Sequence, residues 1–238
     1  MFLLKRISAC VLLAIAVLSM TAPSVVSAPI TVPTGLNVGD QYRLAFLTST
    51  TRNATSSNIA DYNAFVTAAA NTQAALTALG TTWTAIASTA TVNAIDNTST
   101  PIGIGGIPIF LMNDTKLVDD YADLWDVTID VPLNINEDGL TSAANRVVWT
   151  GTNTSGTATA NPLGSSTGTI GDAAFTGGIW INDTTLSDRF LRQFYGVSDV
   201  ITVQETIVIP EPAPISLLAL GLTGLAISRR KRAALNTP

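Results

Sequence analysis

The sequence predicts one α+β domain of mixed short strands, two to three helices and long loops, with an apolar helical segment at each end. Two observations predict this. The long apolar runs of the 238-residue chain lie near its termini. Between them, alternating patterns typical of strands are interspersed with patterns of helical period. Residues 28–206 are enough for one domain with its own core.

Residues 1–27 have the layout of a secretory signal peptide. Lys5 and Arg6 form a short positive segment, and residues 7–18 form an apolar run that is too short to span a membrane. Signal peptidase tolerates proline badly directly after the cut. A cut before Ala28 avoids this, so we expect the mature protein to begin there.

Cleavage there removes Cys10, the single cysteine of the chain, and the sequence has no histidine. Ser-His-Asp and Cys-His arrangements and histidine-based zinc sites are therefore excluded. Paired carboxylates could still hydrolyse a glycoside, and the adjacent Glu137 and Asp138 are the candidates. They lie in an Asn-Glu-Asp-Gly stretch, where a role in a turn also explains them. We expect a protein that is not an enzyme.

The first half of the domain predicts two strands and two helices. Alternating apolar side chains predict a strand over residues 42–48. Asn58, or the serine before it, is placed to cap a helix whose apolar side chains recur over residues 59–69. A second helical piece over residues 73–79 ends at a glycine, and residues 83–88 predict a short strand.

Residues 116–126 predict a third helix, because four apolar side chains recur at the spacing of one helix face. Aspartates occupy the positions between them and form a solvated acidic face on such a helix. A calcium-attracting patch is the alternative, with Asp119, Asp120 and Asp123 as its candidate ligands. The regular spacing and turn glycine of an EF-hand loop are absent. We expect no metal or cofactor, with Ca²⁺ as the alternative.

The remaining segments predict strands and long loops. Residues 107–111 are apolar, and residues 147–152 predict a strand that runs into a turn. Residues 153–178 are rich in Gly, Ser and Thr and predict a long surface loop, the kind of segment that carries binding on a rigid scaffold. Short strands are expected over residues 179–181 and 200–207.

Five segments add residue-level detail to this order of elements. They are residues 83–88 after the second helix, 107–111 leading into Leu124 and Trp125, 148–152 before a glycine-rich loop, Trp180, and 195–198. Together they resemble the C-type-lectin-like fold, specifically its endostatin-like branch, over residues 42–203. The resemblance implies a single lectin-like domain.

The departures from that family limit what carries over. Lectin-like domains usually have disulfides, and endostatins use arginines for heparin and histidines for zinc. With no histidine and six basic residues in the domain, neither function carries over. The stretch from Trp180 to Asp183 is similar to the Trp-Asn-Asp calcium motif of lectins, but Ile181 is inserted. In a strand the insertion places the two polar side chains on different faces, so we interpret the match as chance.

Charge is concentrated by region. Six of the 12 basic residues lie in the two ends, whereas all 17 acidic residues lie between Asp40 and Glu211. The mature region has six basic residues and a net charge of −11, or −10 without Glu211. Such a domain repels nucleic acid and anionic membrane surfaces. It also repels acidic polysaccharides unless a divalent cation bridges them.

The C-terminal segment, residues 207–238, combines three features in one order. Pro210, Glu211 and Pro212 precede an apolar stretch over residues 213–228, about 24 Å of helix at ~1.5 Å per residue, which is marginal for a bilayer. A basic cluster follows, as expected for a cytoplasmic stop. Its members are Arg229, Arg230, Lys231 and Arg232. A plain anchor or a buried core helix are the alternatives, and the order of the three features favours a sorting signal.

This tail resembles the PEP-CTERM sorting domain of Gram-negative bacteria that make exopolysaccharide. The resemblance implies that a transmembrane exosortase recognises the Pro-Glu-Pro residues and cuts near them. We therefore expect signal peptidase and exosortase as partners, passage through the inner membrane, a transient membrane anchor, and delivery to the cell surface or beyond. The domain is then a non-enzymatic module for an exopolysaccharide or another matrix component. The alternatives are a structural or adhesive matrix protein and a carboxylate-based polysaccharide hydrolase.

Overall fold

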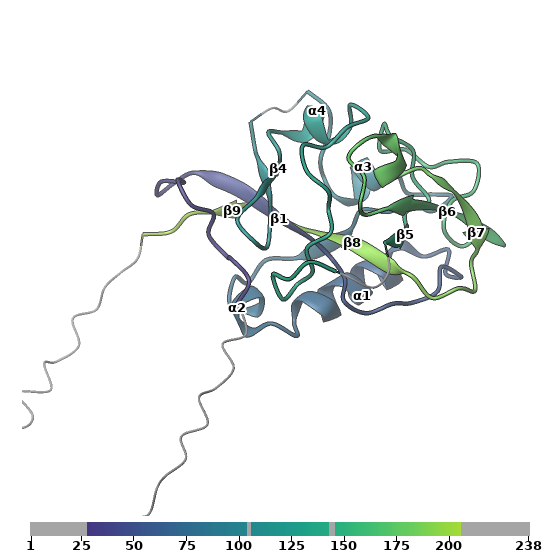
Figure 1. The fold of residues 1–238 in the computed structure, drawn as a ribbon, viewed down its shortest axis with the longest axis horizontal. Helices are drawn as coiled ribbons and strands as arrows, with labels where there is room; N and C mark the ends of the chain where they lie inside the picture. The colour runs from purple at the N-terminus through teal and green to yellow at the C-terminus, as the bar shows by residue number, and fades with distance from the viewer. Residues whose placement is uncertain (1–27, 104–105, 143–145, 206–238) are drawn as a thin grey trace, which may run out of the picture.

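The computed structural model describes residues 28–103, 106–142 and 146–205. They form a mixed α+β domain in which one sheet dominates and the helices are few (Figure 1). No helix within these ranges is long and apolar enough to cross a bilayer. The signal peptide expected over residues 1–27 and the apolar helix expected over residues 213–228 lie outside the described residues.

The sheet has nine strands in the described part of the chain. They are β1 (Gln41–Leu47), β2 (Trp83–Ala85), β3 (Ile109–Leu111), β4 (Lys116–Val118), β5 (Val147–Trp149), β6 (Thr167–Asp172), β7 (Thr184–Ser187), β8 (Gln193–Ser198) and β9 (Ile201–Thr202). Their order is β4-β3-β1-β8-β5-β6-β7, with β2 paired to β8 and β9 paired to β1. The β1–β3 and β5–β8 pairs are parallel, and the other pairs are antiparallel.

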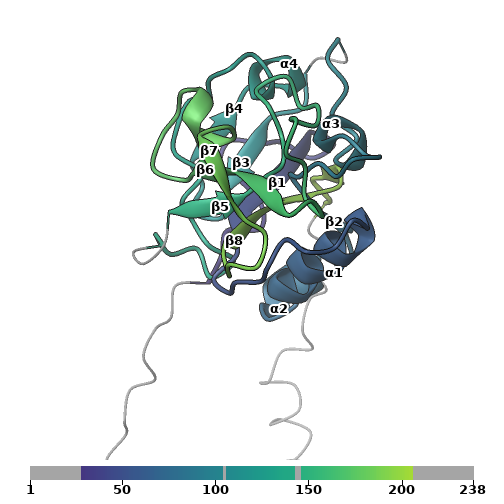
Figure 2. The ribbon, with the colours of Figure 1, turned by 90° about the vertical axis from the view of Figure 1, so that its right-hand side faces the viewer.

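The helical segments are short apart from the first. They are α1 (Ile59–Ala70), α2 (Ala74–Thr77), α3 (Ala94–Asn97), α4 (Tyr121–Leu124) and the 3₁₀ turn η1 (Gly178–Trp180). Figure 2 shows α1 and α2 together on one side of the domain, close to β2. The predicted helix over residues 59–69 is confirmed, and the Asn58 side chain caps it by accepting the Ala60 N–H at 3.1 Å.

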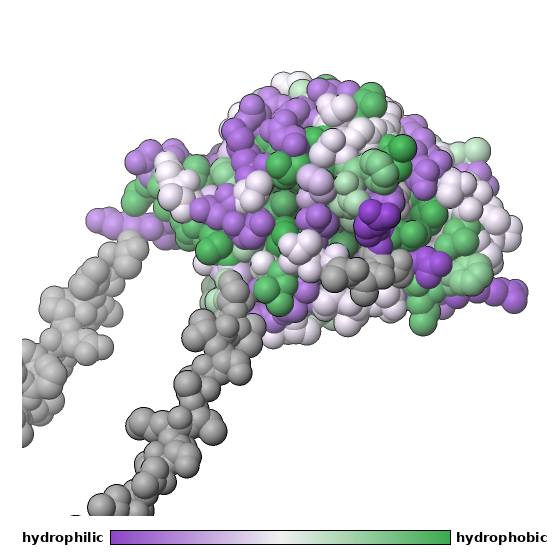
Figure 3. Space-filling view, viewed as in Figure 1, coloured by the Kyte–Doolittle hydropathy of each residue, from purple (hydrophilic) through white to green (hydrophobic). Residues whose placement is uncertain are grey.

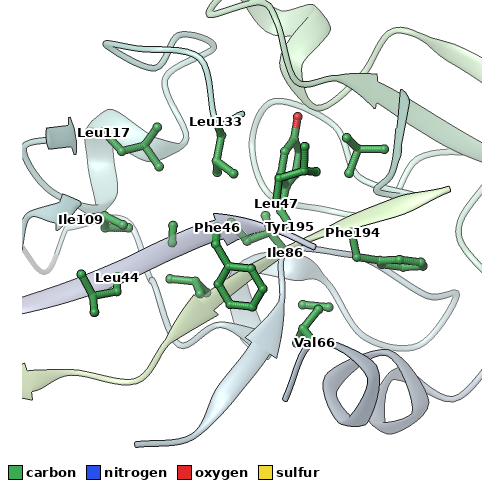
Figure 4. Packing of buried hydrophobic residues seen from close by; sticks show 14 of the residues in the cluster. Leu44, Phe46, Leu47, Val66, Ile86, Ile109, Leu117, Leu133, Phe194 and Tyr195 are labelled. Atoms are coloured by element: carbon green, nitrogen blue, oxygen red, sulfur yellow. The ribbon is translucent and has the colours of Figure 1, made fainter. Parts of the chain in front are cut away.

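The centre of the sheet is the antiparallel pair β1–β8, in which Ala45 lies opposite Val197 and Leu47 opposite Tyr195. The predicted first strand is confirmed, but both of its faces are covered. Residues 42–47 are all buried, and so is every residue of β8. Figure 4 shows side chains of both strands within the core, beside Val66 of α1.

The helix predicted over residues 116–126 is wrong in its first half. Residues 116–118 form β4, which pairs with β3 through a turn at Asp114, where φ is +73°. The helical part is reduced to α4, which begins after Asp120. The spacing of apolar residues over 116–118 is compatible with a helix and with a strand. A strand forms because β3 provides backbone hydrogen bonds to this segment.

The surface loop predicted over residues 153–178 is also wrong, because this segment contains β6 between β5 and β7. Its glycines permit close packing. A Cβ at Gly168 would lie 2.9 Å from the Trp149 ring, and one at Gly171 would lie 2.0 Å from the backbone oxygen of Trp180. The strand predicted over residues 179–181 is wrong as well, since this segment begins in η1.

The close approach at Gly171 generates a stability prediction. Gly171→Ala should lower the free energy of unfolding by about 3 kcal/mol or more, because the added methyl group meets backbone that cannot move aside. Gly177→Ala is the matched control, because a Cβ there meets nothing within 4 Å. Urea unfolding of both variants checks the prediction. Equal losses in the two would contradict this account of β6.

Candidate functional site

A cleft of about 660 Å³ lies between the α2–β2 loop and the end of the β8–β9 segment. One wall is residues 78–82, the other is residues 199–204, and Val32 and Tyr42 complete the lining. In Figure 1 these walls are found at α2 and at β9. The cleft is thus built from segments that are far apart in the sequence.

The cleft exists because β2 and β8 separate. They pair from Trp83 opposite Ser198, and the last hydrogen bond between the segments joins the Asp199 N–H to the Thr82 oxygen at 2.9 Å. Before this point Gly80, at φ +60°, turns the chain out of α2 and toward β2. After it, β9 moves across to pair with β1. In the described residues, the outer edge of β9 therefore has no strand beside it.

The lining combines apolar and hydroxyl-bearing side chains. Val32 and Leu79 contribute apolar surface, and Thr81, Thr82 and Thr202 contribute hydroxyl groups. Tyr42 of β1 is a further lining residue, and its buried hydroxyl donates to the Thr31 oxygen at 2.5 Å. Burial raises the pKa of Tyr42. That hydroxyl is already paired, so the threonines are the hydroxyl groups available to a ligand.

The charged end of the cleft is an ion pair. The Asp199 Oδ1 atom lies 3.6 Å from Nη2 of Arg43, with 62% of the Asp199 side chain exposed and 3% of the Arg43 side chain exposed. Arg43 also donates to the backbone oxygens of Thr98 and Ser99, at 2.6 and 3.1 Å. Because Asp199 is largely exposed to solvent, its attraction to Arg43 is screened and adds little stability. A smaller hollow of about 60 Å³, lined by Arg43, shares Asp199 and Thr82 with the cleft.

This arrangement suits binding more than hydrolysis. Glycoside hydrolysis uses two carboxyl groups that flank the scissile bond, and Asp199 is the carboxylate in the cleft lining. Hydroxyl groups, an amide at Gln204 and one carboxylate can instead exchange hydrogen bonds with a polyhydroxylated ligand. The cleft can therefore hold an uncharged polar chain.

The two carboxylates predicted as hydrolase candidates lie outside both hollows. Glu137 is 1% exposed and accepts the Ser49 N–H at 2.8 Å and the Ser49 hydroxyl. Asp138 accepts hydrogen bonds from the side chains of Gln73 and Asn136. These contacts fasten the 135–141 turn to the segment after β1 and to α2, which agrees with the turn interpretation.

The aspartates predicted as calcium candidates serve the local backbone. Asp120 caps α4 by accepting the N–H groups of Ala122 and Asp123, at 2.8 and 3.0 Å. Asp123 accepts the Asp119 N–H at 2.7 Å, and Asp119 pairs with Lys116. Across the described ranges, no three metal-ligating side chains form a group that could hold an ion. The expectation of no metal and its calcium alternative both stay predictions.

Asp123 allows this alternative to be tested. Partial burial raises the pKa of its carboxyl group, and nearby Asp130, Asp126 and Asp119 add to the rise. The folded protein therefore holds the proton of the Asp123 carboxyl group more tightly than the unfolded chain does. The contribution of Asp123 to the free energy of unfolding then falls as the pH rises above 3.8, the ordinary pKa of an aspartate.

Asp123→Asn should therefore leave the melting temperature at pH 7 unchanged or raise it by up to about 2 °C, because the amide oxygen can still accept the Asp119 N–H. The difference should shrink in acid, where Asp123 takes up a proton. Thermal melts against pH check this, with the exposed Asp183→Asn as control. Calcium binding predicts the reverse: added Ca²⁺ would stabilise the parent protein more than Asp123→Asn.

The predicted sorting residues Pro210, Glu211 and Pro212, and the predicted basic stop at residues 229–232, lie outside the described residues. The cleft residues Thr81, Thr82 and Asp199 were missed by sequence reasoning. Their spacing carries no signal, because the fold alone brings the three segments that form the cleft together. The glycine stop after α2 and the start of β2 were the visible local signs of a break.

No protein-family model matches this chain, and a search of curated proteins finds no similar sequence.

Proposed function

We propose that this chain is an exported cell-surface or extracellular protein whose domain binds an exopolysaccharide or another matrix component without catalysis. The observation that carries the proposal is the open cleft with threonine hydroxyls and a single carboxylate, Asp199. The cleft is open and runs between two separate chain segments, residues 78–82 and 199–204, which suits an extended polymer better than a small compact ligand.

The negative charge of the domain disfavours anionic ligands. The described residues carry six basic and 16 acidic side chains, so an anionic polymer meets an unfavourable field over most of the surface. The carboxylate in the cleft adds to this locally. A neutral or amino-sugar polymer is the class that the cleft favours.

The sequence of the two ends supports export. A signal peptide cut before Ala28 would leave the domain intact, because its first strand, β1, begins at Gln41. At the other end, Pro210 comes a few residues after Glu205, where the described domain ends. Cleavage by an exosortase near the Pro-Glu-Pro residues would leave the whole domain intact.

We further propose that the domain is C-type-lectin-like and closest to the endostatin-like branch. The resembling segments are brought together in the core. The rings of Trp125 and Trp180 lie 6.5 Å apart, and the Tyr195 hydroxyl donates to the Trp180 oxygen at 3.0 Å. Asn182 and Asp183 are both exposed after η1 instead of lying on a strand.

Two other functions stand as alternatives. A structural or adhesive matrix protein would need no ligand in the cleft. A carboxylate-based hydrolase would act through Glu137, and its turnover would be abolished by Glu137→Gln. The engagement of both Glu137 oxygens by Ser49 favours a structural role for this residue.

The double variant Thr81→Val and Thr82→Val tests the proposed site. It removes two hydroxyl groups from the cleft and keeps the β-branched shape, so binding should weaken at least about tenfold while folding is retained. Isothermal titration with exopolysaccharide purified from the host bacterium measures the loss.

Thr184→Val with Thr185→Val is the matched control, because these two threonines are exposed on β7 and line neither hollow. This control should bind as the parent does. Absence of binding by the parent protein would refute the exopolysaccharide proposal. Equal affinity of the cleft variant and the parent would refute the site.

A further inference from the structure

Positive charge gathers at one turn of an otherwise acidic domain. Residues 188–192 join β7 to β8, and the four residues of this turn that follow Asp188, residues 189–192, are named the basic tip. They are Arg189, Phe190, Leu191 and Arg192, with Phe190 50% exposed and Leu191 56% exposed. Arg52 lies alongside, since its N–H and oxygen bond to the oxygen and N–H of Arg192 at 3.0 and 2.9 Å. Three of the six basic residues of the domain thus lie together.

The basic tip is held in place by its own contacts. The Arg192 guanidinium lies 5.5 Å from the centre of the Phe190 ring, and it donates to the Leu191 oxygen at 2.8 Å. The Arg52 guanidinium lies 4.8 Å above the Tyr62 ring. Within the described ranges, no carboxylate forms an ion pair with these arginines. Figure 3 shows hydrophilic and apolar side chains side by side at this end of the domain.

A second exposed surface has the opposite charge. Val127, Phe175 and Ile179 are exposed by 48%, 46% and 42%. Their two segments run side by side, because the Ile129 N–H donates to the Thr176 oxygen at 2.9 Å. These three side chains, with the neighbouring aspartates 126 and 130, are named the acid-rimmed patch. Both aspartates are exposed.

The backbone at Val127 indicates that the patch has a role. Its φ of +94° lies in the left-handed region, which is strained for a β-branched residue and free for glycine. The side chain is exposed, so burial in the core does not offset this strain. A valine held outward at a position suited to glycine is expected where the side chain contacts a partner.

The two surfaces lie at opposite ends of one hairpin. In the antiparallel pair β6–β7, Thr167 lies opposite Ser187 and Ile170 lies opposite Thr184. The basic tip follows Ser187 at one end. The 175–179 segment of the acid-rimmed patch connects β6 to β7 at the other end. One molecule therefore cannot bring its own two surfaces together.

We propose that the basic tip of one copy docks on the acid-rimmed patch of a second copy. Phe190 and Leu191 would cover Val127 and its apolar neighbours, while the exposed Arg189 would face the aspartates. Such a contact joins two different surfaces, so it repeats head to tail and builds an open-ended row of domains. The partner is a second copy because both halves of a complementary pair are exposed on this one chain.

Sedimentation analysis of the secreted protein tests the proposal with one variant for each surface. The tip variant is Arg189→Glu with Phe190→Ser, and the patch variant is Val127→Gly with Ile179→Ser. The parent's average mass should rise steadily with concentration and fall with added salt. Each variant alone should associate at least about tenfold more weakly. An equimolar mixture of the two should form a dimer and grow no further.

Single substitutions separate contact from folding. Val127→Gly relieves the backbone strain, so association should weaken while the melting temperature does not fall. Val38→Ser is the control, since Val38 is 65% exposed and lies outside both surfaces. A parent that stays monomeric, a mixture of the two double variants that forms no dimer, or a tip variant that loses only binding to an anionic polysaccharide would each overturn the proposal.

Discussion

The burial of β8 is the constraint on which the rest of the structure depends. All six of its residues are buried, and it pairs with β1, β2 and β5, so it joins the early strands of the domain to the late ones. A Cβ at Gly196 would lie 2.8 Å from the Phe46 ring, which shows how closely the neighbouring strand packs. The described residues contain no cysteine. Apolar packing and the hydrogen bonds of the sheet therefore carry the stability.

The same strand positions the cleft and the basic tip, the two surfaces proposed to bind a ligand and a second copy. Arg192 of the basic tip directly precedes β8, and Asp199 of the cleft directly follows it. A ligand held at one end and a second copy held at the other would be connected by the most buried segment of the domain. In the proposed function, rows of domains would then present clefts at regular intervals along a polymer, which increases the avidity of weak single contacts.

Local signals in the sequence predicted the elements that depend on local interactions. The cap at Asn58 and the apolar spacing after it predicted α1, and the alternation of apolar side chains over residues 42–48 predicted β1. The failures have physical reasons of their own. Residues 116–118 match a helix by their local pattern, but β3 provides a strand partner and they form β4. The glycines of β6 match a loop by composition, but Gly168 and Gly171 are needed there because Trp149 and Trp180 pack against them. The cleft combines three distant segments, which no spacing reveals.

The proposed function requires that this acidic domain is delivered to the outside of the cell without the segments at either end. Mass spectrometry of the protein secreted by its host reads both ends in one measurement. We predict an N-terminus at Ala28 and a C-terminus close to the Pro210–Pro212 stretch, with residues 229–238 absent. A secreted protein that still carries residues 229–238 would contradict processing by an exosortase.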